Sequence, residues 1–323
     1  MKHAITETEF EGFRAYRMET DDAQVTATFV PGAGMVGASL THRGEELLVQ
    51  ENGLRAYVEN GKTFGIPLLH PWGNRLQSDT YRVGQIGADL KPVANLVARD
   101  PNGLPIHGLA AGRKEWTVTG VTAGITCACL TATLDINADS PIFPGFPFPH
   151  KLEHTITLAA VNSGACLAIE TKLMATGQIR VPVAFGWHPY FHLPGIKREE
   201  WVVDVPVRRH YRLSEQNLPT REREPVAVKK GPLGNRIYDD LFDELVCANG
   251  NRTTFTLEGG QRNLAVCFEF GYPYAIVWAP AGRDLICFEP MTAATNALAS
   301  GWPELICVEP GESYVARFSI LVS

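Results

Sequence analysis

The sequence lacks the long apolar segments that a membrane protein needs. No apolar run approaches the roughly 20 residues that span a bilayer, and residues 1–20 alternate charged and polar residues with single apolar ones rather than forming a signal peptide. Stripes of Lys and Arg with interleaved aromatic residues are also missing, and the formal net charge is −6. We therefore expect no membrane and no nucleic acid as partner, and a cytoplasmic protein.

Two further absences narrow the class of protein. The chain has no alternation of strands and helices with a glycine-rich phosphate loop, which argues against a Rossmann or P-loop nucleotide site. Its seven cysteines show no zinc-finger spacing, since Cys127 and Cys129 are too close for the usual pair. We interpret the cysteines as buried, reduced thiols.

What the sequence does contain is mostly strand signals. Alternating apolar and polar residues mark segments 24–30, 168–174 and 313–322, and 30 glycines and 22 prolines separate such segments at short intervals. Evidence for helices is poor, although segment 233–245 is amphipathic enough to predict a short helix or turn. The pattern predicts an all-β protein, a single large antiparallel β-sandwich with few short helices, and one domain over residues 1–323.

Three short segments carry polar groups suited to binding hydroxyls. Asn74 and Arg75 follow a Pro-Trp-Gly turn, and the guanidinium offers a fixed fork of donors. His107 is followed at once by a glycine, which permits close approach of a backbone or ligand. Asp239 and Asp240 place adjacent carboxylates in an apolar setting. Taken alone, each segment also fits an ordinary turn, a helix cap or a structural histidine.

Two other segments carry a proton donor and a proton acceptor. His188 lies among the aromatic residues of segment 185–193, where burial lowers a histidine pKa and a nearby carboxylate raises it. Glu289 ends an apolar, strand-like run, and Pro290 stops the strand there, which places the carboxylate at a sheet rim. A near copy of this run ends at Glu309. A histidine and a carboxylate embedded in this way can act as acid and base on one neutral substrate.

These segments, in this order, resemble the aldose 1-epimerase (galactose mutarotase-like) family. The resemblance rests on five motifs, which are Asn74-Arg75, His107-Gly108, His188-Pro189-Tyr190-Phe191, Tyr238-Asp239-Asp240-Leu241-Phe242 and Phe288-Glu289-Pro290. It spans most of the chain, from near residue 25 to the end. Trp187 and His192 stand where the galactose-acting members carry asparagines, so the pattern is closer to the broad bacterial branch.

The resemblance implies the mutarotase-type sandwich, or supersandwich, with a sugar site in its concave face. It also implies roles for particular residues. Glu289 matches the catalytic base and His188 the general acid, while Arg75, His107 and Asp239 match substrate-binding positions. Three further binding candidates are Asn74, Asp240 and Trp187. An alignment shift of one residue would select Asp240 instead of Asp239. Trp187, like Trp72, offers an aromatic face on which a sugar ring can stack.

The implied activity is interconversion of the α and β anomers of a free aldohexose by acid–base-catalysed ring opening and closure. Proton transfer alone requires neither a metal nor an organic cofactor, so we expect none. The expected partner is a small-molecule sugar, and the expected assembly is a monomer or homodimer.

Three alternatives remain open from the sequence. One is a hexose 6-phosphate mutarotase, which needs further cationic groups, for which Arg75, Lys172 and Arg180 are candidates. Another is a non-catalytic carbohydrate-binding or sensing protein on the same fold. A third is a metal hydrolase using His70, His107, His188 and His192. His188 and His192 are four residues apart, a spacing that could bind a metal on a helix, but Pro189 disrupts a helix there and disfavours this alternative.

Overall fold

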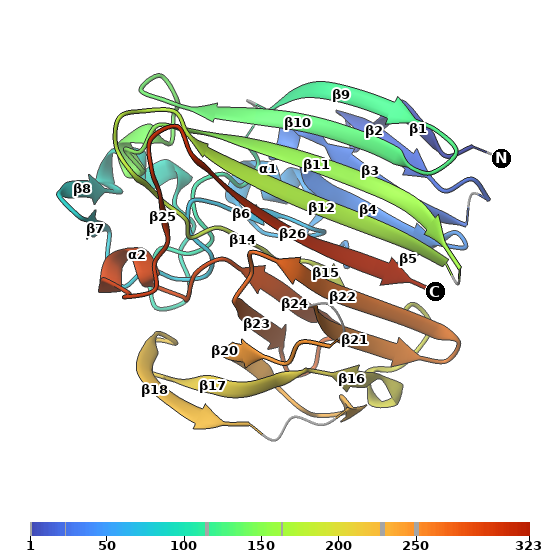
Figure 1. The fold of residues 1–323 in the computed structure, drawn as a ribbon. Helices are drawn as coiled ribbons and strands as arrows, with labels where there is room; N and C mark the ends of the chain where they lie inside the picture. Colours follow the sequence, from blue (N-terminus) through green and yellow to red (C-terminus); the bar gives the residue numbers. More distant parts are fainter. Residues whose placement is uncertain (1, 23, 114–115, 163, 227–229, 249–251) are drawn as a thin grey trace.

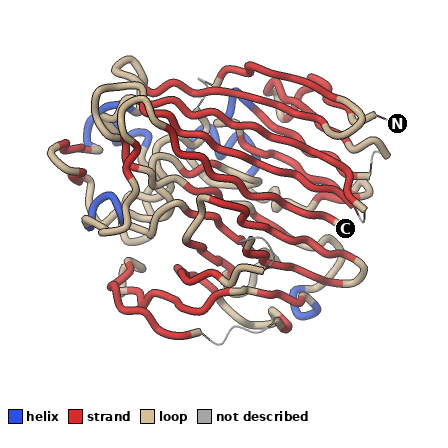
Figure 2. The backbone as a smooth tube through the Cα atoms, in the orientation of Figure 1, coloured by secondary structure: helices blue, strands red, loops and turns tan. Residues whose placement is uncertain are grey.

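The computed structural model describes residues 2–22, 24–113, 116–162, 164–226, 230–248 and 252–323 (Figure 1). Strands account for 53% of the structure and helices for 9%, which confirms the predicted all-β class. Figure 2 shows the same balance, with long strands crossing the molecule and helices confined to short connections. None of the helices in the described ranges is both long enough and apolar enough to cross a membrane.

The largest sheet has nine strands, and its described pairings are antiparallel. In spatial order its strands are β19 (Gly231–Pro232), β16 (Val202–Asp204), β21 (Thr253–Gly259), β22 (Arg262–Phe270), β26 (Ser313–Val322), β12 (Gly164–Ala175), β11 (His150–Val161), β10 (Ala128–Ile136) and β9 (Thr117–Ala123).

The second sheet has eight strands and carries most of the candidate site. Its strands, again antiparallel, are β18 (Pro219–Pro225), β17 (Val207–Leu213), β20 (Tyr238–Leu245), β23 (Tyr274–Ala279), β24 (Ile286–Met291), β14 (Gly186–Trp187) and β6 (Leu68–Leu69), with β15 (Tyr190–Phe191) also paired to β24.

Smaller elements complete the fold. A five-stranded sheet contains β1 (Ala4–Phe10), β2 (Phe13–Glu19), β3 (Val25–Val30), β4 (Val36–His42) and β5 (Glu45–Glu46). Two-stranded sheets pair β7 (Thr80–Val83) with β8 (Ile86–Asp89), and β13 (Val181–Pro182) with β25 (Cys307–Val308). The helices are α1 (Gly53–Asn60), α2 (Ala297–Ser300) and the short 3-10 helices η1 (Pro31–Ala33), η2 (Lys91–Leu96), η3 (Phe143–Gly145) and η4 (Arg198–Glu200).

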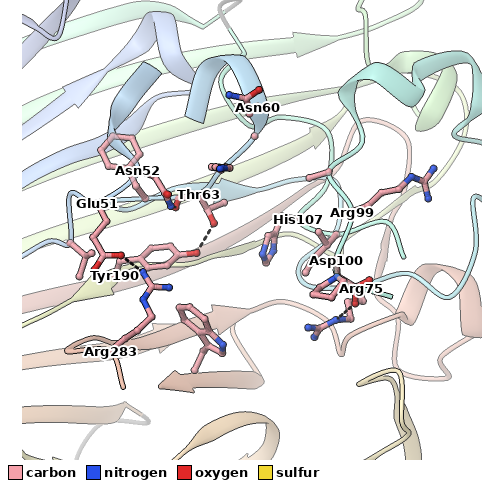
Figure 3. Close-up of a pocket in the computed structure, with 18 residues that line it drawn as sticks. Glu51, Asn52, Asn60, Thr63, Arg75, Arg99, Asp100, His107, Tyr190 and Arg283 are labelled. Carbon is pink, nitrogen blue, oxygen red and sulfur yellow. Dashed lines mark hydrogen bonds and ion pairs between the residues drawn. The ribbon is translucent and has the colours of Figure 1, made fainter. Parts of the chain in front are cut away.

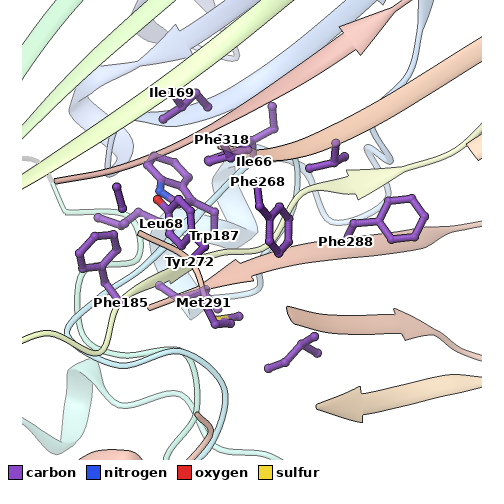
Figure 4. Close-up of a cluster of buried hydrophobic side chains, with 14 of the residues drawn as sticks. Ile66, Leu68, Ile169, Phe185, Trp187, Phe268, Tyr272, Phe288, Met291 and Phe318 are labelled. Atoms are coloured by element: carbon purple, nitrogen blue, oxygen red, sulfur yellow. The ribbon is translucent and has the colours of Figure 1, made fainter. Parts of the chain in front are cut away.

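The main core lies between the nine-stranded and eight-stranded sheets. Phe318 from β26 packs against Trp187 from β14 with 5.8 Å between ring centroids, and Phe255 from β21 packs against Phe288 from β24 at 5.5 Å. Figure 4 shows Trp187, Phe288 and Phe318 in one cluster of buried side chains. Because this core covers one face of the eight-stranded sheet, the other face is left for a site.

Two local expectations are corrected. Tyr238–Leu245 forms strand β20 rather than a short helix or turn, because β17 and β23 supply hydrogen-bonding partners on both sides. The apolar spacing of four residues that suggested a helix also keeps side chains on one face of a strand, since four is a multiple of two. The thiols are not uniformly buried: Cys267 and Cys287 are buried, whereas Cys247 is exposed.

Candidate active site

The register of three neighbouring strands places the first set of site residues on one sheet face. Asp239 of β20 lies opposite Trp278 of β23, and Ile276 of β23 lies opposite Glu289 of β24. Opposed residues, and residues two apart along a strand, point to the same face of a sheet. These four side chains therefore share one face, while Phe288 points to the opposite face and into the core.

The turn between β14 and β15 adds the histidine. Tyr190 of β15 pairs with Cys287 of β24, two residues before Glu289. His188 lies just before this strand, and its backbone N–H donates a hydrogen bond to the Pro67 carbonyl at 3.1 Å. This arrangement brings the imidazole beside the Glu289 carboxylate although the two residues are far apart in sequence.

Two loops hold the remaining predicted residues. The His107 N–H donates to the Asn74 carbonyl at 2.9 Å, and both residues have left-handed backbone angles, with φ of 65° and 54°. Gly108 follows with φ of 74°, and a Cβ added there would lie 2.2 Å from the His70 carbonyl oxygen. Only glycine fits this approach, as the His-Gly motif suggested. Left-handed non-glycine residues of this kind concentrate at functional sites.

These elements surround an inner cavity of about 130 Å³. Six residues named from the sequence line it, together with four others, and the ten are Asn74, Arg75, Ile106, His107, His188, Tyr190, Asp239, Ile276, Trp278 and Glu289. A second cavity of about 420 Å³ adjoins it and shares five of these residues. Figure 3 shows this larger cavity with His107 near its centre, Tyr190 on one side and Arg75 on the other.

His188 and Glu289 form a buried acid–base pair. His188 Nε2 lies 3.4 Å from Glu289 Oε1, and the two residues are 4% and 1% exposed. Burial, and then the nearby Asp239, raise the pKa of Glu289 well above its ordinary value. Burial, and then His107, lower the pKa of His188 well below its ordinary value. Burial therefore favours the uncharged form of each group, the protonated carboxyl of Glu289 and the neutral imidazole of His188.

The same two side chains keep free polar atoms for a ligand. Glu289 Oε2 and His188 Nδ1 are buried and have no hydrogen-bond partner among the described residues. Buried polar atoms are normally satisfied, and an orphaned pair in one cavity indicates a place where substrate or water binds.

Tyr190 supports the imidazole by stacking on it. The two rings are parallel within 2°, with 4.3 Å between centroids, and Tyr190 Oη donates to or accepts from Thr63 Oγ1 at 2.5 Å. Tyr190 Oη also lies 3.3 Å from His188 Nε2. Because the rings are parallel, that contact runs perpendicular to the imidazole plane, where neither the lone pair nor the N–H points. It is a packing contact, and Nε2 remains directed elsewhere.

Arg75 organises the polar wall. Its Nε donates to Asp100 Oδ2 at 2.8 Å and its Nη1 to Asn74 Oδ1 at 2.9 Å, while Nη2 lies 3.9 Å from Asp239 Oδ2. Burial, followed by Arg75, lowers the pKa of His107 to about 3, so this histidine is neutral near pH 7. The wall thus presents a fixed cation, a neutral imidazole and the Asp239 carboxylate to the cavity.

A family model described as aldose 1-epimerase matches residues 15–321 of this sequence. The chain belongs to the aldose 1-epimerase family. The resemblance inferred from the five motifs is therefore confirmed, and the family model covers the segments that build the cavity.

Individual relatives are distant. The uncharacterized protein YihR of Escherichia coli K12 is 24% identical over 307 residues, which cover 90% of this chain and 87% of YihR. A galactose mutarotase-like protein from Clostridium acetobutylicum aligns with a TM-score of 0.83 and 17% identity, over 100% of this chain and 99% of that one. A galactose 1-epimerase from Lactobacillus acidophilus aligns at 0.73 and 16%, also over 100% and 99%. These structures show that the fold is the expected mutarotase-like sandwich.

Two members of the predicted site lie elsewhere. Trp187 is fully buried in the core, where its indole N–H donates to Thr171 Oγ1 at 3.3 Å. It therefore offers no stacking face to a sugar. Trp72 is buried as well, with 1% of its surface exposed. Strand alternation is the reason, since His188 and Trp187 point to opposite faces. Asp240 follows the same rule, because Asp239 faces the cavity and Asp240 faces His210 Nδ1 at 3.6 Å. Of the two aspartates, Asp239 is the one that lines the inner cavity.

Several lining residues were not found from the sequence. Trp278 carries no motif, and only the strand register shows that it faces the cavity. Asp100, which lines the larger cavity and accepts a hydrogen bond from Arg75, also carries no motif. The same holds for Asn217, which lines neither cavity but donates a hydrogen bond to Asp239. Tyr190 was named only as part of the His188 motif and was given no role of its own. A strand of alternating apolar residues does not reveal which face meets a ligand, so these residues needed the structure.

Of the alternative cations and metal ligands, Arg75, His107 and His188 line the inner cavity and the others do not. Arg180 pairs with Glu309 at 3.0 Å beside a separate cavity, and Lys172 lies on β12 of the other sheet. His70 instead contacts His150, with 2.9 Å between their Nε2 atoms. Across the described residues, no three His, Cys, Asp or Glu side chains are grouped so as to hold a metal ion.

Proposed function

We propose that this protein is an aldose 1-epimerase that interconverts the α and β anomers of a free aldohexose. The observation that carries the proposal is the 3.4 Å contact between His188 Nε2 and Glu289 Oε1 in a cavity lined by hydroxyl-binding groups. The two reacting oxygens of an aldose, O1 and O5, are bonded to one carbon. A single acid–base pair at short range can therefore reach both.

In the proposed mechanism, the pair reacts as carboxylate and imidazolium. The carboxylate–imidazolium pair holds the same number of protons as the neutral pair and differs from it only in the position of one proton. Binding of a polar substrate therefore needs only to move that proton from Glu289 to His188. Glu289 then accepts the proton of the O1 hydroxyl while His188 donates its proton to O5. The C1–O5 bond breaks, and the open-chain aldehyde forms.

Ring closure uses the same groups in reverse. Rotation about C1–C2 exposes the other face of the carbonyl, O5 attacks C1, His188 recovers its proton and Glu289 returns the other to O1. Arg75 and neutral His107 orient ring hydroxyls, and Asp239 accepts hydrogen bonds from them. General acid and base contributions of about 10²–10⁴ each suit a reaction that already proceeds in water.

The test is the decay of optical rotation of freshly dissolved α-glucose, with a panel of other anomerically pure aldoses. Wild-type protein should accelerate the decay, and Glu289→Gln should lose about 10²–10⁴ of that acceleration because it has no base. Glu309→Gln is the matched control, since Glu309 ends the near-identical sequence run but its side chain is 61% exposed and paired with Arg180. It should keep wild-type activity.

Two results would reject this proposal. A protein that binds aldoses but leaves the rate of mutarotation unchanged is a carbohydrate-binding or sensing protein. Equal activity of wild type and Glu289→Gln would remove the proposed base. Activity confined to hexose 6-phosphates would instead select the phosphosugar alternative.

A further inference from the structure

The Asp239 carboxylate is held from outside the cavity that it lines. Asn217 donates a hydrogen bond from its Nδ2 to Asp239 Oδ2 at 3.2 Å, although Asn217 itself lines neither cavity. This is the one hydrogen bond found for the carboxylate among the described residues. The Arg75 guanidinium is farther away, with 3.9 Å from its Nη2 to Asp239 Oδ2. The reaction derived above uses Asp239 and gives Asn217 no role.

The strand that carries Asp239 does not fix the direction of its carboxylate. On one side of β20, Asp239 pairs with Trp278 of β23. On the other side, the pairing of β17 with β20 ends at His210 and Phe242, before it reaches Asp239. The Asp239 side chain keeps 37% of its surface exposed. Packing alone therefore leaves the carboxylate free to change rotamer, and a hydrogen bond is needed to select one.

Asn217 lies in the turn between β17 and β18, which is closed by its own hydrogen bonds. The Asn217 N–H donates to the Ser214 carbonyl at 2.9 Å, and the Ser214 N–H donates to the Leu218 carbonyl at 2.8 Å. Asn217 has a left-handed backbone, with φ of 57°. Glycine, asparagine and aspartate adopt this region more readily than other residues. The closed turn presents the Asn217 amide at a defined place beside Asp239.

A second set of contacts anchors the hairpin of β17 and β18. Arg221 of β18 donates from its Nη2 to the Ser300 carbonyl at 3.1 Å, at the end of α2, and its guanidinium lies 5.6 Å from the centroid of the Trp302 ring. The Trp302 indole N–H donates to Tyr274 Oη of β23 at 3.2 Å. Figure 1 shows β17 and β18 at the edge of the molecule, on the side of α2. The hairpin is thus tied to the sheet that carries the site.

We propose that Asn217 is a positioning residue, which holds the Asp239 carboxylate in the rotamer that accepts hydrogen bonds from the sugar. Its amide N–H binds Oδ2 and leaves Oδ1, for which no hydrogen bond with a described residue is found, to the substrate hydroxyls. Asn217 does not touch the reacting atoms and acts only through Asp239. The inference rests on the proposed epimerase function, because it deepens the account of the same site.

The competing interpretation is that Asn217 serves only the turn. Asparagine is common at left-handed turn positions whatever its side chain touches. Two substitutions separate the two roles. Asn217→Gly keeps the left-handed backbone without strain and removes only the amide that contacts Asp239. Asn217→Asp keeps the shape and the backbone preference but replaces the N–H donor with a second carboxylate.

The first experiment measures KM and kcat by polarimetry with the aldose that the wild-type protein converts fastest. Asn217→Gly should raise KM about threefold to tenfold and change kcat less than about twofold, because Asp239 binds hydroxyls that do not react. Gln216→Gly, which removes an exposed side chain from the same turn, is the matched control and should change neither. An unchanged KM in Asn217→Gly, or an equal rise in Gln216→Gly, would overturn the proposal.

Asn217→Asp should give a pH signature that a purely structural change of the turn would not. Two carboxylates in contact repel each other when both are charged and share a proton as the pH falls. At about pH 8 the KM of this variant should be about tenfold above that of wild type. At about pH 5 the ratio should fall to within about threefold, because a shared proton restores a hydrogen bond to Asp239.

The comparison with wild type at each pH isolates the substituted position. The variant keeps the other charged groups near Asp239, which are Arg75, Asp100, Asp240 and Glu289. The titration of the acid–base pair affects both proteins equally and cancels in the ratio. A ratio of KM values that stays constant between about pH 8 and about pH 5 would contradict the proposed contact.

A measurement without sugar keeps the inference testable if turnover is absent. The pKa of Asp239 can be followed by NMR in protein with ¹³C-labelled aspartate carboxyl groups, with Asp239→Asn identifying the signal. The Asn217 N–H stabilises the charged carboxylate, so the pKa of Asp239 should rise by up to about one unit in Asn217→Gly. An unchanged pKa would reject the positioning contact. A raised pKa in a protein that does not accelerate mutarotation would support the contact and reject only the proposed reaction.

Discussion

Replacing Glu289 with glutamine should stabilise the protein at neutral and alkaline pH. Glu289 is 1% exposed, and its Oε2 has no hydrogen-bond partner among the described residues. Burial is the main reason that its pKa lies well above 4.5, and Asp239 adds to the shift. Glutamine has nearly the same shape but no charge to bury, so the difference in stability measures the cost of keeping this carboxyl inside.

The sign follows from proton binding. A carboxyl whose pKa is raised in the folded state stabilises the fold most at low pH, and that contribution is lost as the pH rises above the unfolded value of about 4.5 toward the folded value. Burial lowers the pKa of His188 in the folded state. Above about pH 6.5 this histidine is therefore neutral in the folded protein and mostly neutral in the unfolded chain. The pH dependence of this pair is then dominated by Glu289.

The expected magnitude is bounded by one proton. Over the range where folded Glu289 holds the proton and unfolded Glu289 does not, wild-type stability falls by at most about 1.4 kcal/mol per pH unit relative to the variant. The substitution also removes an acidic group whose unpaired oxygen costs about 1–3 kcal/mol, although the new amide must find partners of its own. A difference of 1 kcal/mol corresponds to roughly 2–4 °C in Tm for a chain of this class.

The assay is urea unfolding followed by tryptophan fluorescence, at about pH 6.5, 7.5 and 8.5. The free energy of unfolding of Glu289→Gln should exceed that of wild type, and the excess should grow with pH. Glu309→Gln, which alters an exposed ion pair worth about 0–1 kcal/mol, should show a small difference that does not grow. A Glu289→Gln excess that is constant or shrinks between pH 6.5 and 8.5 would refute the claim that burial holds the proton on Glu289.

Three further predictions concern neighbouring side chains. Asp239→Asn should reduce kcat/KM about tenfold through lost hydrogen bonds to substrate. Asp240→Asn, on the opposite face of the strand, is the control and should keep kcat/KM within about twofold of wild type. A larger loss in Asp240→Asn than in Asp239→Asn would contradict the strand register. Tyr190→Leu should move the acid limb of the pH–rate profile to lower pH by up to about one unit, because the stacked ring stabilises the His188 cation. Tyr190→Phe keeps the ring and should not move this limb. A shift to higher pH in Tyr190→Leu would mean that Tyr190 only excludes water. Trp187→Leu should lower the free energy of unfolding, measured by urea unfolding, by about 2–4 kcal/mol, while KM changes less than threefold. A large rise in KM with unchanged stability would instead mean that Trp187 contacts the sugar.

The alternation of apolar and polar residues was enough to predict the all-β class, because strands that are half buried repeat every two residues. It did not identify β20 correctly, since apolar residues four apart satisfy a strand and a helix equally. The correct element emerges only when β17 and β23 supply partners on both sides. Tertiary pairing of this kind is not encoded within the segment itself.

For the site, the motifs identified residues that carry chemistry but not the direction in which they point. Glu289 and Glu309 end nearly identical runs, yet one lies in the cavity and the other is exposed. Trp187 and His188 are adjacent, yet one packs in the core and the other lines the cavity. The difference in each case is the face of a strand or the course of a turn, which depends on register with distant strands.

The central claim is that the inner cavity holds an aldose with O1 at Glu289 and O5 at His188. A crystal structure of the Glu289→Gln variant with a bound aldose tests it directly, since this variant should bind sugar without turning it over. We expect O1 within hydrogen-bonding distance of the substituted amide and O5 within that distance of a ring nitrogen of His188. A sugar bound away from both side chains, or bound with its anomeric carbon facing the larger adjoining cavity, would contradict this placement.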